Sequence, residues 1–95
     1  MSELMGLIEG IYDAKAQGFV PGGISIHNSF IPHGPDSEAF AAATEAELVP
    51  SKGPDSLAIM WESRYRWVPT SWAMGLSELQ GDYSERWSEL GRQWD

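Results

Sequence analysis

Apolar and polar positions alternate over short stretches of this chain, and Gly and Pro separate each stretch from the next. Residues 4–12 form an apolar segment with the pattern of a strand, although two glycines interrupt it. Residues 14–18 predict a turn or a single helical turn. Apolar positions alternate again over residues 24–26, and this period predicts a strand with one buried face.

Two stretches predict short helices instead. The Ala-rich segment 35–48 has acidic residues in its first turn and ends before Pro50, as helices commonly do. Asp82 and Glu85 have the spacing of a capping box, which predicts a second helix over residues 82–92. An aromatic and aliphatic stripe runs along this second helix. It is formed at helical spacing by Tyr83, Trp87, Leu90 and Trp94. We expect the stripe to dock on the protein's own sheet or on a neighbouring subunit.

Further strands are predicted in the second half of the chain. Residues 56–62 carry apolar side chains on both faces of a strand, so both faces are expected to be buried. Residues 65–68 predict another short strand, which ends at Pro69. The fold class that follows is mainly β with short peripheral helices.

Composition narrows the class of protein. The 95 residues are 42% hydrophobic and include five Trp, which favours a folded core over disorder. A net charge of −8 argues against nucleic acid and anionic lipid as partners. There is no cysteine, hence no disulfide framework, and a cytoplasmic setting is expected. No apolar run approaches the roughly 20 residues that cross a bilayer, so we expect no membrane partner.

Both histidines of the chain lie in one segment broken by Gly and Pro. His27 and His33 are six residues apart, and an extended chain of that length spans about 20 Å. They can share one site only if the segment bends. With Glu3 they would supply two histidines and one carboxylate, the donor set of many non-haem Fe(II) centres. The alternative is one histidine held in a turn and the other solvated.

Tyr12 is a further candidate for a site residue. It follows the segment that carries Glu3, and its hydroxyl is able to hydrogen-bond a ligand. A half-buried core tyrosine explains the same pattern equally well.

In order along the chain, several segments resemble the C-terminal part of the homogentisate 1,2-dioxygenase family. They include Met-Ser-Glu at the start and His-Gly-Pro-Asp after the second histidine, and together they cover residues 1–8, 12–15, 18–23, 25–27, 33–36, 58–63 and 83–87. The resemblance extends over nearly the whole chain, at the spacing of the family.

This resemblance implies an enzyme that cleaves the ring of homogentisate with O2, giving maleylacetoacetate in tyrosine and phenylalanine catabolism. It implies non-haem Fe(II), a cupin-like (jelly-roll) β-sandwich and a homo-oligomer, which is a hexamer in the family. By position, Glu3 and His33 match iron ligands, and His33 and Tyr12 match residues that contact substrate. His27 matches a histidine that lies near the substrate without binding the iron.

The family's first iron-ligand histidine and its proton-acceptor histidine both precede the Met-Ser-Glu motif. The resemblance therefore assigns no proton-transfer residue to this chain. It predicts that residues 1–95 are the C-terminal part of an incomplete cupin domain, lacking the N-terminal domain. We expect such a chain to be inactive alone.

Three functions stay open from the sequence. The first is a segment of a homogentisate dioxygenase that is active only when complemented. The second is a non-catalytic remnant or oligomerisation module that packs through its Trp-rich stripe. The third is an independent small cupin-like protein that binds a metal or an aromatic acid.

Overall fold

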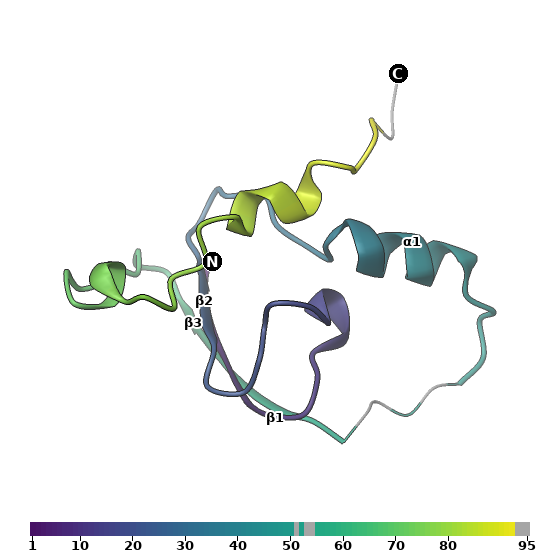
Figure 1. Ribbon diagram of the computed structural model, residues 1–95, viewed down its shortest axis with the longest axis horizontal. Helices are drawn as coiled ribbons and strands as arrows, with labels where there is room; N and C mark the ends of the chain where they lie inside the picture. The colour runs from purple at the N-terminus through teal and green to yellow at the C-terminus, as the bar shows by residue number, and fades with distance from the viewer. Residues whose placement is uncertain (51, 53–54, 93–95) are drawn as a thin grey trace.

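A computed structural model describes residues 1–50, 52 and 55–92 of the chain. In chain order its elements are β1 (Ser2–Glu9), η1 (Asp13–Lys15), β2 (Ile24–His27), α1 (Ser37–Glu45), β3 (Leu57–Ser63), η2 (Ala73–Gly75) and η3 (Tyr83–Trp87) (Figure 1). The η elements are short stretches of 3-10 helix, of three to five residues. Within the described residues the fold is therefore mainly β with few helices, as the sequence predicts.

The three strands form one open antiparallel sheet in the order β2-β1-β3. The register places Glu3 opposite His27 on one side of β1 and opposite Glu62 on the other. A bulge between Leu7 and Glu9 shifts the pairing with β3. Because side chains alternate across a strand, Glu3, Met5 and Leu7 point to the same face of the sheet.

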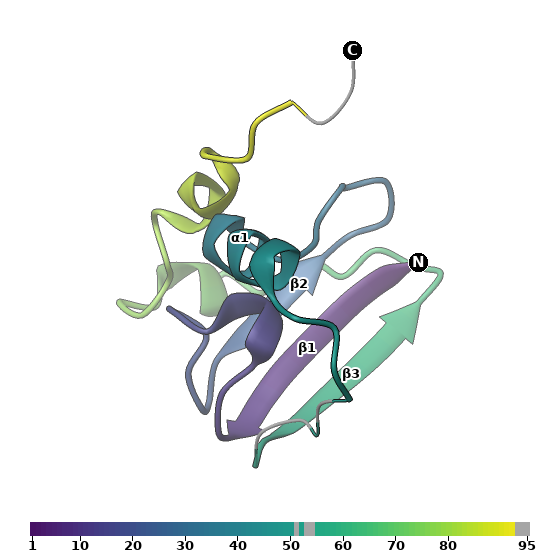
Figure 2. The ribbon, with the colours of Figure 1, turned by 90° about the vertical axis from the view of Figure 1, so that its right-hand side faces the viewer.

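The helices η1, α1 and η3 lie on one side of the sheet, which is seen nearly edge-on in Figure 1 and face-on in Figure 2. The buried apolar core beneath them is small and includes Leu7 and Phe19. Phe19 also makes an edge-to-face contact with Tyr12, at 5.9 Å between ring centroids. One face of the sheet thus carries both the core and the side chains of a possible site.

Three predictions about the second half of the chain are wrong in detail. Residues 65–68 form no strand, because the backbone of Trp67 pairs with the side chain of Asn28 and not with a neighbouring strand. The strand β3 is present, but neither of its faces is buried: Ile59 and Trp61 on one face and Met60 on the other are 40–50% exposed.

The third concerns the last helix, which is a 3-10 turn ending at Trp87 and not an α-helix to residue 92. Its predicted capping box is absent, since the side chain of Asp82 makes no cap bond and instead accepts from Arg86 at 3.4 Å. Trp94 of the predicted stripe lies outside the described residues.

The predicted first helix is confirmed as α1, although it is shorter than residues 35–48. Asp36 is its N-cap, with Oδ1 accepting from the Ala39 N–H at 2.9 Å. Asp36 is buried at 4% exposure, so its side chain is held in place for this bond. Asp36→Ala is expected to lower the free energy of unfolding by about 1–2 kcal/mol. Urea unfolding, monitored by circular dichroism, measures this loss of stability. An unchanged unfolding midpoint would contradict the capping role.

No helix in the described part of the chain is both long and apolar enough to cross a membrane.

Candidate metal centre

The register of β1 and β2 brings Glu3 beside His27. These two residues are direct partners across the antiparallel pair, so their side chains leave the sheet on the same face. His33 arrives from the loop after β2. We name Glu3, His27 and His33 the histidine–glutamate cluster; one ligand atom from each lies within 4.8 Å of the others. Of the two alternatives left open by the sequence, the structure shows the one in which the segment bends and brings the two histidines together.

The imidazole rings of His27 and His33 are stacked, with centroids 4.1 Å apart and planes 5° from parallel. His33 Nδ1–H donates to the Ile31 carbonyl at 3.0 Å, and its Nε2–H donates to Glu3 Oε2 at 2.9 Å. Both partners are acceptors, and they raise the pKa of His33, the Ile31 carbonyl contributing most and the Glu3 carboxylate next. The ring is thus held at both nitrogens.

His27 lies deeper in the fold. Burial lowers its pKa, and the neighbouring His33 lowers it further, against a smaller raising effect of Glu3. Its Nε2 shares a hydrogen bond with the hydroxyl of Tyr83, a residue 56 positions further along the chain. Burial raises the pKa of Tyr83, so its hydroxyl keeps its proton at neutral pH.

The turn η3 covers the cluster from above the sheet. Tyr83 packs against Trp87 at 5.0 Å between ring centroids, and Trp87 Nε1–H lies 3.1 Å from the carbonyls of both Gly34 and Pro35. Lys15 places its ammonium 3.7 Å from the centre of the Tyr83 ring, a cation–π contact. Burial lowers the pKa of Lys15, and the positive charge of Arg86 adds to that effect.

A cavity of about 390 Å³ opens beside the cluster. Its lining brings together all four residues singled out from the sequence, Glu3, Tyr12, His27 and His33, with others from β3, η1 and η3. Apolar contributions come from Met5, Phe19 and Met60, and polar ones from Lys15 and Tyr83. A mostly apolar pocket with a few convergent polar groups is the usual form of a small-molecule site.

Sequence reasoning missed Lys15 and Tyr83 as residues of this pocket. Tyr83 belongs to the stripe for which only a packing role was expected, and Lys15 lies in a segment that resembles the family but was given no role of its own. The one signal for Tyr83 was the prediction that the stripe docks on the protein. That prediction did not indicate which residues the stripe would cover.

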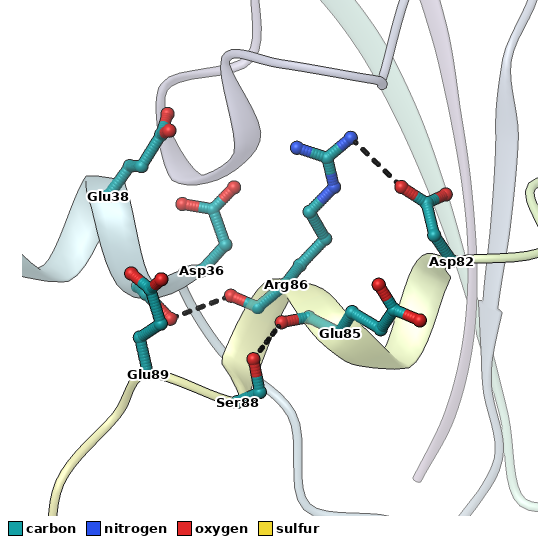
Figure 3. Close-up of a pocket in the computed structure, with 8 residues that line it drawn as sticks. Asp36, Glu38, Asp82, Glu85, Arg86, Ser88 and Glu89 are labelled. Atoms are coloured by element: carbon teal, nitrogen blue, oxygen red, sulfur yellow. Dashed lines mark hydrogen bonds and ion pairs between the residues drawn. The ribbon is translucent and has the colours of Figure 1, made fainter.

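A second hollow, of about 320 Å³, lies between α1 and η3 (Figure 3). Five carboxylates surround Arg86 there: Asp36, Glu38, Asp82, Glu85 and Glu89. Ser37 Oγ donates to the Arg86 carbonyl at 2.8 Å, which joins the start of α1 to η3. This region holds η3 in place over the cluster, and it contributes no histidine.

The fold and the site together define a mainly β protein with a candidate metal centre of two histidines and one carboxylate. The family described as "Homogentisate 1,2-dioxygenase C-terminal" matches residues 1–94. The chain belongs to this family.

Curated relatives agree with this assignment. Homogentisate 1,2-dioxygenases of Nitrobacter hamburgensis, Rhodopseudomonas palustris and Rhizobium etli are 54%, 55% and 54% identical to the chain over 95 residues. Each alignment covers 100% of this chain and 21% of the relative. The chain therefore spans about a fifth of the length of the curated relatives it matches.

Proposed function

We propose that this chain provides Glu3 and His33 as ligands of a non-haem Fe(II) centre in a homogentisate 1,2-dioxygenase. The reaction is cleavage of the aromatic ring of homogentisate by O2 to give maleylacetoacetate. The proposal combines the family of the chain with the geometry of its histidine–glutamate cluster.

The observation that carries the proposal is the pair of hydrogen bonds at His33. Its Nδ1–H donates to a backbone carbonyl, and its Nε2 faces Glu3 Oε2 at 2.9 Å. Histidines that bind metals use this arrangement, in which one nitrogen is held by a carbonyl and the other is presented to the ion. A carboxylate and imidazole nitrogens are also donors that suit Fe(II). The cluster therefore fits the ion.

When bound, Fe(II) supplies Lewis-acid chemistry and open coordination positions for O2 and a substrate oxygen. The chain's own residues do the positioning. Tyr12 lines the cavity with its hydroxyl available to orient a substrate, and His27 stands next to the ligands with its Nε2 on Tyr83. The apolar side chains Phe19 and Met60 provide walls for an aromatic ring.

We also propose that the sheet is part of a cupin-like β-sandwich within a larger assembly. Its outer face carries Ile24, Leu57, Ile59 and Trp61, which are 40–67% exposed. Both β2 and β3 are edge strands of the described sheet. Apolar surface and unpaired strand edges of this kind call for additional structure to cover them.

The test is a graft in which this chain replaces the matching 95 residues of the Nitrobacter hamburgensis enzyme, to which it is 54% identical. We expect the graft to bind about one iron per chain and to take up O2 when homogentisate is added. The unmodified enzyme and a version lacking the segment are the two controls. A graft that folds with the same size and melting temperature as the parent but consumes no O2 would refute the proposal.

A second candidate, an independent metal-binding protein, is favoured by one observation. Three donors from this chain alone lie within 4.8 Å of one another. Anaerobic titration of the separate 95-residue chain with Fe(II) distinguishes the two. Tight binding at one ion per chain, lost in both Glu3→Ala and His27→Ala, would favour the independent binder over the dioxygenase segment.

A further inference from the structure

Asn28 lies between the two histidines of the cluster and is bonded to a distant part of the chain. The Trp67 N–H donates to Asn28 Oδ1 at 2.8 Å, and Asn28 Nδ2–H donates to the Trp67 carbonyl at 3.1 Å. The amide therefore uses both of its ends on one residue of the segment after β3. Such two-point pairing fixes the side chain and the backbone that carries it.

A second anchor holds the next residue. The Ser29 N–H donates to Ser2 Oγ at 3.0 Å, and the two hydroxyls are 3.1 Å apart. Ser2 is fully buried at 0% exposure and directly precedes Glu3. The segment after β2 is thus tied to the same strand that carries the carboxylate of the cluster.

Between these anchors and His33 the chain makes a tight turn. The Ile31 N–H donates to the Asn28 carbonyl at 3.1 Å, and Phe30 adopts φ 69°, the left-handed region that a non-glycine residue seldom occupies. The Phe30 side chain is fully exposed, so packing of that side chain does not explain its conformation. The turn aims the Ile31 carbonyl at His33 Nδ1, at 3.0 Å.

We propose that Asn28 is a positioning residue for His33, acting through the turn 28–31 and the Ile31 carbonyl. The inference rests on the proposed function, in which His33 binds the metal. An unusual backbone conformation persists only where its surroundings impose it, and the Asn28–Trp67 pair supplies that restraint together with the Ser29–Ser2 anchor. Asn28 is not itself one of the three cluster residues, and it does not line the cavity.

The physical consequence concerns which nitrogen His33 presents. While the Ile31 carbonyl holds Nδ1–H, the ring has one orientation, and Nε2 faces Glu3. When the turn is released, the ring is free to rotate. Metal binding must then order the ring again, and this cost lowers the binding free energy. Loss of a group that orients a ligand typically reduces metal affinity 10- to 100-fold.

The first test compares Asn28→Ala, Asn28→Asp and the matched control Ser63→Ala in the graft. Ser63 Oγ accepts from the Tyr65 N–H at 2.9 Å, so Ser63→Ala removes a similar bond in the same region without touching the turn. Titration with Co(II) measures affinity. We expect a loss of about tenfold for Asn28→Ala and a smaller loss for Asn28→Asp, which keeps the acceptor for Trp67. Ser63→Ala should bind like the parent.

The second test needs no metal. In the metal-free 95-residue chain, the His33 Nδ1–H proton should give an NMR resonance slowed in exchange by the Ile31 carbonyl. We expect Asn28→Ala to lose this resonance and Ser63→Ala to keep it. If the graft binds no Co(II), the proposed metal function fails, while the resonance still decides the role of Asn28. A resonance unchanged in Asn28→Ala, or an equal loss in Ser63→Ala, would overturn the inference.

Discussion

His33→Ala is expected to remove the iron of the graft and reduce its homogentisate-dependent O2 uptake to background. The matched variant His27→Ala should keep its iron and lose only part of the rate. The two imidazoles are stacked 4.1 Å apart, so both variants open similar space in the same place. The two variants differ in the group that they remove. Of the two histidines, only His33 has its Nε2 directed at Glu3, at 2.9 Å.

The physical reason is the difference between a ligand and a group that orients by hydrogen bonding. Removing one of few ligands takes away both affinity and geometry. Removing a hydrogen bond costs on the order of 1–3 kcal/mol, so His27→Ala and Tyr12→Phe should retain measurable rates, about 10- to 100-fold below the parent.

Iron content and O2 uptake are to be measured on the same samples, with Glu3→Ala as a second ligand variant. If His33→Ala kept iron and rate while His27→Ala lost both, the two histidines would have exchanged roles. If neither substitution mattered, the assignment of this cluster to the iron would be wrong.

Gly10→Ala is expected to destabilise the fold by more than about 3 kcal/mol, because among the glycines that the structure describes an added methyl group meets its closest contact at this one. Gly10 follows β1 with φ 79°, and a Cβ there would lie 2.2 Å from the Asp55 carbonyl oxygen and 2.8 Å from Ser56 Cα. These are backbone atoms of the two residues just before β3, so relief requires the start of β3 to move away from the end of β1.

Gly22→Ala is the matched control, since Gly22 has a similar φ of 88° and no atom within 4 Å of an added Cβ. It should cost only the left-handed conformation, about 1 kcal/mol. Urea unfolding of both variants separates the cost of the left-handed backbone conformation, which both share, from the cost of the steric clash, which only Gly10→Ala has. Equal losses for the two glycines would show that the contact between β1 and β3 is looser than described.

Local rules were sufficient for several elements of this fold. The alternation at residues 24–26 predicts β2, and the acidic start of the Ala-rich segment predicts α1, although the structure shows Asp36 as its N-cap and not as a residue of its first turn. Such features depend on neighbours within a few residues, which the sequence displays directly. The motifs around Glu3 and His33 were likewise sufficient to indicate the family.

Other features depend on which of several possible partners a residue takes, whether that partner is near or remote in sequence. The predicted strand at 65–68 does not form because Trp67 pairs with Asn28, 39 residues earlier. The predicted cap at Asp82 fails because its carboxylate binds Arg86 instead. In both cases a tertiary or side-chain partner outcompetes the local preference, as propensities of this size allow.

The sequence by itself determined which donors this protein offers, since Glu3, His27, His33 and Tyr12 were all identifiable by type and motif. Only the tertiary structure decided how they meet. Pairing of β1 with β2 sets Glu3 beside His27, the turn 28–31 returns His33 onto its neighbour, and η3 brings Tyr83 over both. These distances arise from the pairing of whole strands and from long-range hydrogen bonds, and both depend on partners that are remote in the sequence.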